Sequence, residues 1–109
     1  MPKIDTLAAY SFSTPLELNK IFTRLNERGP WRWMERDSEY YGDYLSCLTC
    51  PEGAKIKIFE EGEQYVLNIR YKRDAPEAPA EWEELQRDIF ERILPAVEAR
   101  DLKPTEGYS

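Results

Sequence analysis

The feature that most constrains the fold of this 109-residue chain is the alternation of apolar residues within residues 55–73. Ile56 and Ile58 fall on one face of a first strand. The matching face of a second strand carries Tyr65, Leu67, Ile69 and Tyr71. A hairpin loop with an even number of residues, such as a two-residue loop at Glu61 and Gly62, places both rows on one face and pairs Ile58 with Tyr65. The chain therefore needs helices to cover one face of a sheet.

A first helix is predicted after residue 14. Thr14 and Glu17 have the spacing of a capping box, and Pro15 suits the first helical position. Apolar residues then recur at helical spacing, at Leu18, Ile21, Phe22 and Leu25. Gly29 and Pro30 predict its end.

A second helix is predicted from about Ala80. Its apolar stripe consists of Trp82, Leu85, Ile89, Ile93 and Val97. Pro95 lacks an N–H group, so the helix is expected to end or kink near Leu94. Pro104 and Gly107 predict that no strand follows, and residues 103–109 are expected to form a loose tail.

Three further segments are predicted to be strands: Lys3–Phe12, Trp31–Arg36 and Tyr40–Cys50. Strand, helix, several strands and helix in this order are typical of an α+β two-layer sandwich. We expect an antiparallel sheet of four to five strands with two helices packed on one face. Residues 1–102 are predicted to form one domain, because a chain of this length buries one core.

Composition excludes several kinds of chemistry. The chain contains no histidine, which is the usual general base near neutral pH and the commonest metal ligand. No catalytic residue, metal site or cofactor is therefore predicted, and the residues favour binding over catalysis. No apolar run approaches the ~20 residues of a membrane span, and the N-terminal residues lack the pattern of a signal peptide. A cytoplasmic protein without a membrane partner is expected.

Cys47 and Cys50 are the only cysteines, with the spacing of half a zinc site or of a dithiol redox centre. Zinc would need two more ligands, and no helix can begin at Pro51 to lower the pKa of a thiol. Residues three apart on a regular strand also point to opposite faces. We interpret the pair as two small structural residues, with a redox or metal role as the alternative.

Two groups of residues are candidates for binding. The aromatic segment contributes Trp31, Trp33, Tyr41 and Tyr44, a residue class enriched at binding hot spots but also suited to filling the core. The second helix contributes Glu81, Glu83, Glu84 and Asp88 in the most acidic part of the chain.

These residues support two hypotheses of function. The first is a non-enzymatic, acidic protein-binding module, such as an inhibitor or immunity-type partner of a basic protein. The second is a small-molecule-binding or enzymatic domain with a cleft lined by the four aromatics and with Glu35 as a base. A deep aromatic pocket would favour the second hypothesis, whereas a flat exposed patch would favour the first.

Nucleic acid is disfavoured as a partner. Lys55, Lys57, Asn68, Arg70 and Lys72 alternate onto the face of the hairpin opposite its apolar rows, where single strands can be bound. The net charge of −6 opposes electrostatic binding of a polyanion over a large surface.

Overall fold

The computed structural model describes residues 3–40, 42–74, 76 and 78–106. The elements, in chain order, are β1 (Lys3–Ser13), α1 (Leu18–Arg28), β2 (Trp33–Ser38), β3 (Gly42–Cys47), β4 (Ala54–Glu61), β5 (Gln64–Asp74), α2 (Ala78–Asp88), a π-helical turn η1 (Ile89–Ile93), α3 (Leu94–Ala96) and β6 (Arg100–Pro104). The fold is α+β, as predicted from the sequence. Among the described residues, no helix is both long and apolar enough to cross a bilayer.

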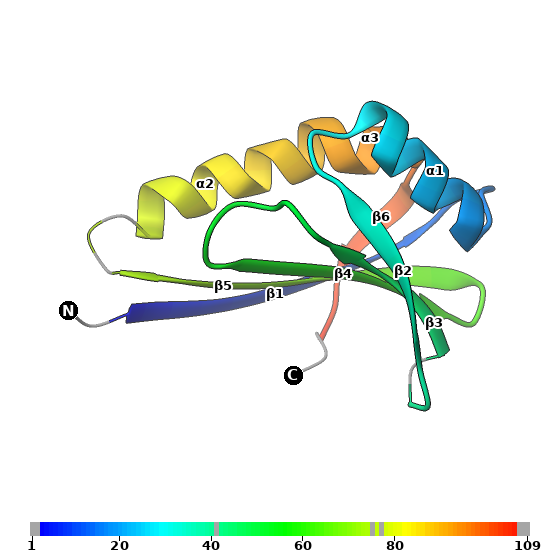
Figure 1. Cartoon of the computed structure of the whole chain (residues 1–109), viewed down its shortest axis with the longest axis horizontal. Helices are drawn as coiled ribbons and strands as arrows, with labels where there is room; N and C mark the ends of the chain where they lie inside the picture. The colour runs from blue at the N-terminus through cyan, green and yellow to red at the C-terminus, as the bar shows by residue number, and fades with distance from the viewer. Residues whose placement is uncertain (1–2, 41, 75, 77, 107–109) are drawn as a thin grey trace.

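The strands form one sheet in the order β2-β3-β4-β5-β1-β6, and each neighbouring pair is antiparallel. Figure 1 shows α1 and the continuous helix formed by α2, η1 and α3 over the same face of the sheet. The sheet has six strands, so the prediction of four to five was too low.

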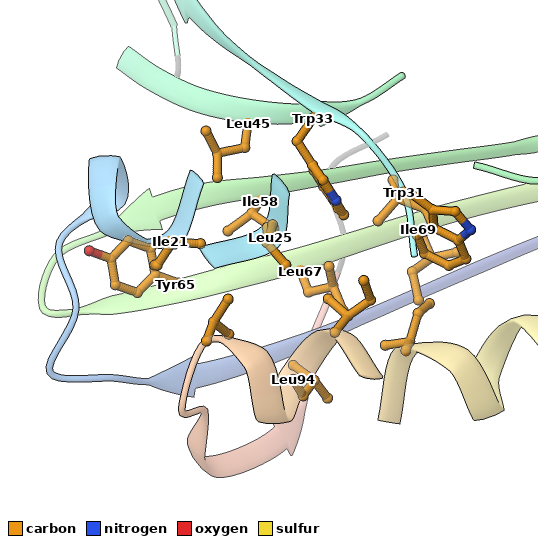
Figure 2. Packing of buried hydrophobic residues seen from close by; sticks show 14 of the residues in the cluster. Ile21, Leu25, Trp31, Trp33, Leu45, Ile58, Tyr65, Leu67, Ile69 and Leu94 are labelled. Carbon is orange, nitrogen blue, oxygen red and sulfur yellow. The ribbon is translucent and has the colours of Figure 1, made fainter. Parts of the chain in front are cut away.

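The core lies between this face of the sheet and the helices (Figure 2). From β5 it receives the predicted row, in which Leu67 and Ile69 are fully buried. The helices contribute Ile21 and Leu25 from α1 and Ile89 from η1, each with no exposed surface. The helical spacing of these residues in the sequence therefore identified the faces that cover the sheet.

The hairpin of β4 and β5 has the predicted two-residue loop, but at Gly62 and Glu63 rather than one residue earlier. Ile58 consequently pairs with Leu67 instead of Tyr65. Gly62 has a φ of +62°, which the first position of a tight hairpin turn requires and which glycine adopts without strain. A loop with an even number of residues keeps the apolar rows of β4 and β5 on the same face of the sheet. The predicted inward face of each strand is therefore confirmed, although the predicted pairing register was wrong by two residues.

Strand β6 corrects the prediction that no strand follows the last helix. It pairs with β1, with Tyr10 opposite Pro104, and so Lys103 and Pro104 belong to the sheet. All five residues of β6 are exposed, which leaves no apolar alternation in the sequence to reveal it. Proline is tolerated here because β6 is an edge strand. Residues 107–109 of the predicted tail lie outside the described residues.

The first helix begins later than the capping box predicted. Its N-cap is Glu17, whose side chain makes no capping hydrogen bond. The Thr14 hydroxyl instead accepts a hydrogen bond from the Leu16 N–H at 3.2 Å and donates one to the Val97 carbonyl at 2.6 Å. Thr14 therefore connects the chain before α1 to the end of α3.

The second helix changes to a π-helical turn before Leu94 and ends at Ala96, close to the predicted position. In η1 the Leu94 N–H donates to the Ile89 carbonyl, five residues back, and Pro95 then lies in the first turn of α3. Because the hydrogen-bonding pattern changes before Pro95, the helix can contain a residue that has no N–H group and has a bulky ring.

Replacing Thr14 with alanine is expected to lower the free energy of unfolding by about 1–2 kcal/mol, because it leaves the Val97 carbonyl and the Leu16 N–H without their partner. Thr14→Ser keeps the hydroxyl and should recover most of the loss. Urea denaturation would measure both. Thr23→Ala is the control, since that exposed hydroxyl donates a hydrogen bond to the Asn19 carbonyl within α1. An equal loss in this control would contradict the role of Thr14.

Candidate functional site

A pocket lies between α2, the end of β5 and the turn that precedes β4. Its volume is about 270 Å³. The lining residues are Pro51, Glu52, Tyr71, Arg73, Glu81, Glu84, Leu85 and Asp88. We call this site the acidic pocket, because four of its residues are carboxylates and one is a cation.

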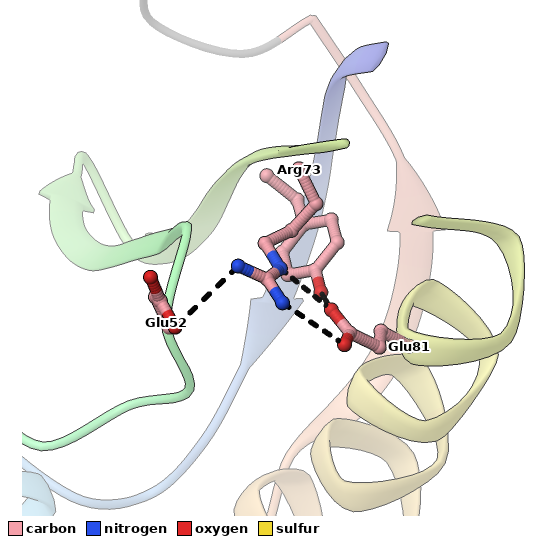
Figure 3. Close-up of polar contacts among 4 residues, drawn as sticks. Glu52, Arg73 and Glu81 are labelled. Carbon is pink, nitrogen blue, oxygen red and sulfur yellow. Dashed lines mark hydrogen bonds and ion pairs between the residues drawn. The ribbon is translucent and has the colours of Figure 1, made fainter. Parts of the chain in front are cut away.

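Arg73 occupies the centre of a charge cluster in this pocket (Figure 3). Its guanidinium donates two hydrogen bonds to the Glu81 carboxylate, at 2.8 and 3.3 Å, and its third nitrogen lies 3.4 Å from Glu52. The Tyr71 hydroxyl donates a further hydrogen bond to Glu81. Three elements thus meet through one arginine, which comes from β5.

The pKa of the Glu81 carboxyl group is lowered in this cluster, and the pKa of the Tyr71 hydroxyl group is raised. Hydrogen bonds from Arg73 and then from Tyr71 hold the pKa of Glu81 below its ordinary value. Burial, followed by the hydrogen bond to Glu81, raises the pKa of Tyr71 to about 12. At neutral pH, Glu81 is therefore a carboxylate whose oxygens accept three hydrogen bonds, and Tyr71 is protonated.

The structure brings three of the predicted acidic residues to this pocket. Glu81 faces Arg73, while Glu84 and Asp88 line the pocket one and two turns further along the helix. Asp88 also lies 3.9 Å from Arg92. Glu83 is exposed and is not among the lining residues.

Glu52, Tyr71 and Arg73 were not predicted as site residues from the sequence. A signal for two of them was present, because the inward-facing row of β5 continues by alternation from Tyr71 to Arg73. An arginine at the end of such a row needs an acidic partner from the element above it. The glutamates that begin α2 provide that partner.

The four aromatic candidates do not form one surface. Trp31 and Trp33 are 8% and 3% exposed and belong to the core. Tyr44 lies on the face of the sheet away from the helices. Its ring stacks on the ring of Phe59, with 5.1 Å between the ring centroids. Tyr41 lies outside the described residues.

The face of the sheet away from the helices carries most of the basic residues of the hairpin. Lys57 lies opposite Asn68, and Lys55 lies opposite Arg70. Arg70 forms an ion pair with Asp5 at 2.9 Å, which reduces the positive charge of this face.

The two cysteines do not point to opposite faces, because β3 ends at Cys47 and the chain bends after it. Both thiols are free, half-buried and packed against the core. In the part of the chain that the structure describes, no group of three or more cysteine or acidic residues is placed to hold a metal ion.

No protein-family model and no curated protein matches this chain.

The Arg73–Glu81 cluster predicts a specific loss of stability in acid. The pKa of Glu81 is lowered in the folded state, so its contribution is fully present above its ordinary pKa and is lost as the pH falls through the folded value. Glu81→Gln should therefore lower the urea midpoint at pH 7, and its difference from the wild type should shrink by about pH 3.

Glu83→Gln, at an exposed neighbouring position, is the matched control for this measurement and should change little at either pH. A constant difference between Glu81→Gln and the wild type from pH 7 to 3 would show that the Glu81 charge does not stabilise the fold.

Trp33→Ala is expected to destabilise the domain by about 3–5 kcal/mol, because it removes a large core side chain. Trp33→Phe should cost much less, since the Trp33 indole Nε1–H is buried and makes no hydrogen bond among the described residues. Chemical denaturation measures both variants. Full stability of Trp33→Ala would contradict a core role for this tryptophan.

Proposed function

We propose that this chain is a non-enzymatic protein-binding module that binds a basic partner through the acidic side of α2. The observation that carries the proposal is the acidic pocket, which opens beside the exposed carboxylates of that helix. An inhibitor or an immunity-type partner of a basic protein is the form of this function that we favour.

The charge of the pocket supports a cationic guest. Its only cation, Arg73, is already paired with Glu81 and Glu52. Glu84 has no ion pair among the described residues, and neither has the adjacent Glu83. The excess charge at this surface is therefore negative, and it attracts a lysine or arginine side chain.

The apolar part of the lining supports a long side chain rather than a small ion. Leu85 and Pro51 lie beside the carboxylates, as does the ring of Tyr71. The aliphatic stem of lysine or arginine packs on such surfaces while its charged head bonds to a carboxylate.

The surroundings of the pocket support a macromolecular partner. Glu83 is exposed on α2 beside the pocket, so the negative charge extends beyond the lining residues at this end of the helix, up to the exposed Arg87. Charges at the rim of an interface increase the association rate and make binding dependent on salt. This pattern fits recognition of a basic surface by a helix face.

An oligo-arginine peptide labelled with fluorescein is the probe for this proposal. Fluorescence anisotropy at low ionic strength should detect binding, and the double variant Glu83→Lys/Glu84→Lys should weaken it by about tenfold. The difference should become small near ~0.5 M salt, where screening limits the interaction to less than ~5 Å.

The matched control is Glu27→Lys/Glu35→Lys, which changes the net charge equally at two exposed positions outside α2. It should weaken binding by less than about twofold. Equal losses in the two double variants would show that the peptide responds only to net charge, and the proposal would then be wrong.

A further inference from the structure

The first half of β1 lies at an edge of the sheet that β6 does not cover (Figure 1). Among the described residues, β6 pairs with β1 only between Tyr10 and Ser13, and the Thr105 N–H donates to the Ala9 carbonyl at 3.0 Å. Residues 4–8 of β1 pair with β5 on one side, and the described part of the chain places no strand on their other side. We call these five residues the open edge.

The backbone of the open edge offers four hydrogen-bonding groups to a further strand. The Ala9 carbonyl points away from β5, because it accepts from Thr105. In a regular strand, the N–H and C=O groups of every second residue point to the same edge. Since β1 pairs with β5 residue by residue over this range, Asp5 and Leu7 also direct their N–H and C=O groups to the open edge.

The side chains of the open edge do not block pairing with another strand. Edge strands are usually protected by charges, by proline or by bulges. Here, Ile4 and Leu7 are 41% and 57% exposed, and alternation places them on opposite faces of the sheet. The charged residue of the open edge, Asp5, is already paired with Arg70 of β5 at 2.9 Å.

The two outer strands of the described sheet are better protected. β2 carries three consecutive exposed charged residues, Glu35, Arg36 and Asp37. β6 contains Pro104, and its pairing with β1 has a bulge. The contrast indicates that the open edge is the place where this sheet can be extended.

We propose that two copies of this chain associate through the open edge, where the two β1 strands pair antiparallel and join the two sheets into one. An antiparallel pair of identical segments is related by a two-fold axis, so each copy supplies the groups that the other needs. The observation that carries the proposal is an unprotected edge with apolar side chains on both faces.

The alternation of side chains and backbone groups defines the register of this pairing. When Thr6 lies opposite Thr6 of the second copy, Leu7 of each copy lies opposite Asp5 of the other. These residues direct their N–H and C=O groups to the open edge, so the two pairs form four hydrogen bonds. Ile4 then lies opposite Ala8, and both belong to the inward face.

The neighbouring registers that keep the faces matched are less favourable. A shift in one direction places Asp5 opposite Asp5, and like charges directly opposite each other are destabilising. A shift in the other direction requires the edge groups of Ala9, whose carbonyl already accepts from Thr105. The register centred on Thr6 is therefore the one that we expect.

This association goes beyond the proposed function and does not depend on it. Pro51 and Glu52 of the acidic pocket precede β4, which lies on the side of β5 away from β1. The pocket therefore stays open in both copies. A pairing of five residues buries less surface than the ~1,200 Å² of a standard stable interface, so monomer and dimer should exchange.

Sedimentation equilibrium of the intact chain, from about 10 µM to about 1 mM, should show a reversible monomer–dimer equilibrium. Leu7→Ser should raise the dissociation constant by about tenfold, because it removes apolar surface that both copies bury. Leu48→Ser is the matched control, since Leu48 is 58% exposed but lies between β3 and β4. It should change the dissociation constant by less than about twofold.

Disulfide cross-linking tests the register, in a Cys47→Ser/Cys50→Ser background that removes the native thiols. Two residues opposite each other in a pair without backbone hydrogen bonds have Cα atoms ~4.5 Å apart, which a disulfide can bridge. Thr6→Cys should therefore give a disulfide-linked dimer under mild oxidation. Ala8→Cys should form it at least about tenfold more slowly, because its two copies lie roughly 13 Å apart along the strands.

Circular dichroism establishes that each variant is folded before it is compared. The proposal is overturned if the wild type stays monomeric up to about 1 mM, which would leave the edge to an extended segment of another protein. Equal effects of Leu7→Ser and Leu48→Ser would show non-specific apolar association and would also overturn it. Equal cross-linking rates of the two cysteine variants would contradict the pairing of the β1 strands.

Discussion

The inward-facing row of β5 is buried because α1 and the helix formed by α2, η1 and α3 lie over it. Leu67 and Ile69 have no exposed surface, and Tyr65 and Tyr71 at the ends of the row are 8% and 1% exposed. Burial of such side chains stabilises the fold by about 1.5–3 kcal/mol each, so both helices must stay on this face.

The acidic pocket forms where this row changes from apolar to charged. The next inward position after Tyr71 is Arg73, directly below the first turn of α2. A guanidinium at the edge of a core must be paired, and Glu81 pairs with it through two hydrogen bonds. The contact that fixes the start of α2 therefore uses Glu81, whereas Glu84 makes no ion pair among the described residues.

The parts of the fold that could be predicted from the sequence are those set by the apolar pattern. Alternation gave the inward faces of β4 and β5, and helical spacing gave the buried faces of α1 and α2. The register of the hairpin depends instead on which residue adopts a positive φ, and Gly62 does so at the first loop position. Strand β6 was missed because its side chains are all exposed, so that only its backbone pairing with β1 defines it.

Polar contacts between distant segments were harder to predict than burial. Thr14 has the sequence context of an N-cap, yet its hydroxyl donates to Val97, which is 83 residues away along the chain. The two tryptophans show the same limit, since an aromatic cluster suits a core as well as a cleft, and here they pack in the core. For the cysteines, the expectation failed because it assumed that β3 continues to Cys50, whereas it ends at Cys47.

The negative charge of the chain is unevenly spread, and α2 carries four acidic residues against one basic residue, Arg87. The glutamates of α2 lie on the helical layer, whereas Lys55 and Lys57 belong to β4 on the far face of the sheet. These two groups lie on opposite sides of the two-layer fold, and exposed charges further apart than about 8 Å, the screening length at physiological ionic strength, are largely screened from each other. The two faces therefore neutralise each other only weakly. A partner that approaches α2 meets the local negative charge of that helix, and the basic face of the sheet does little to reduce it.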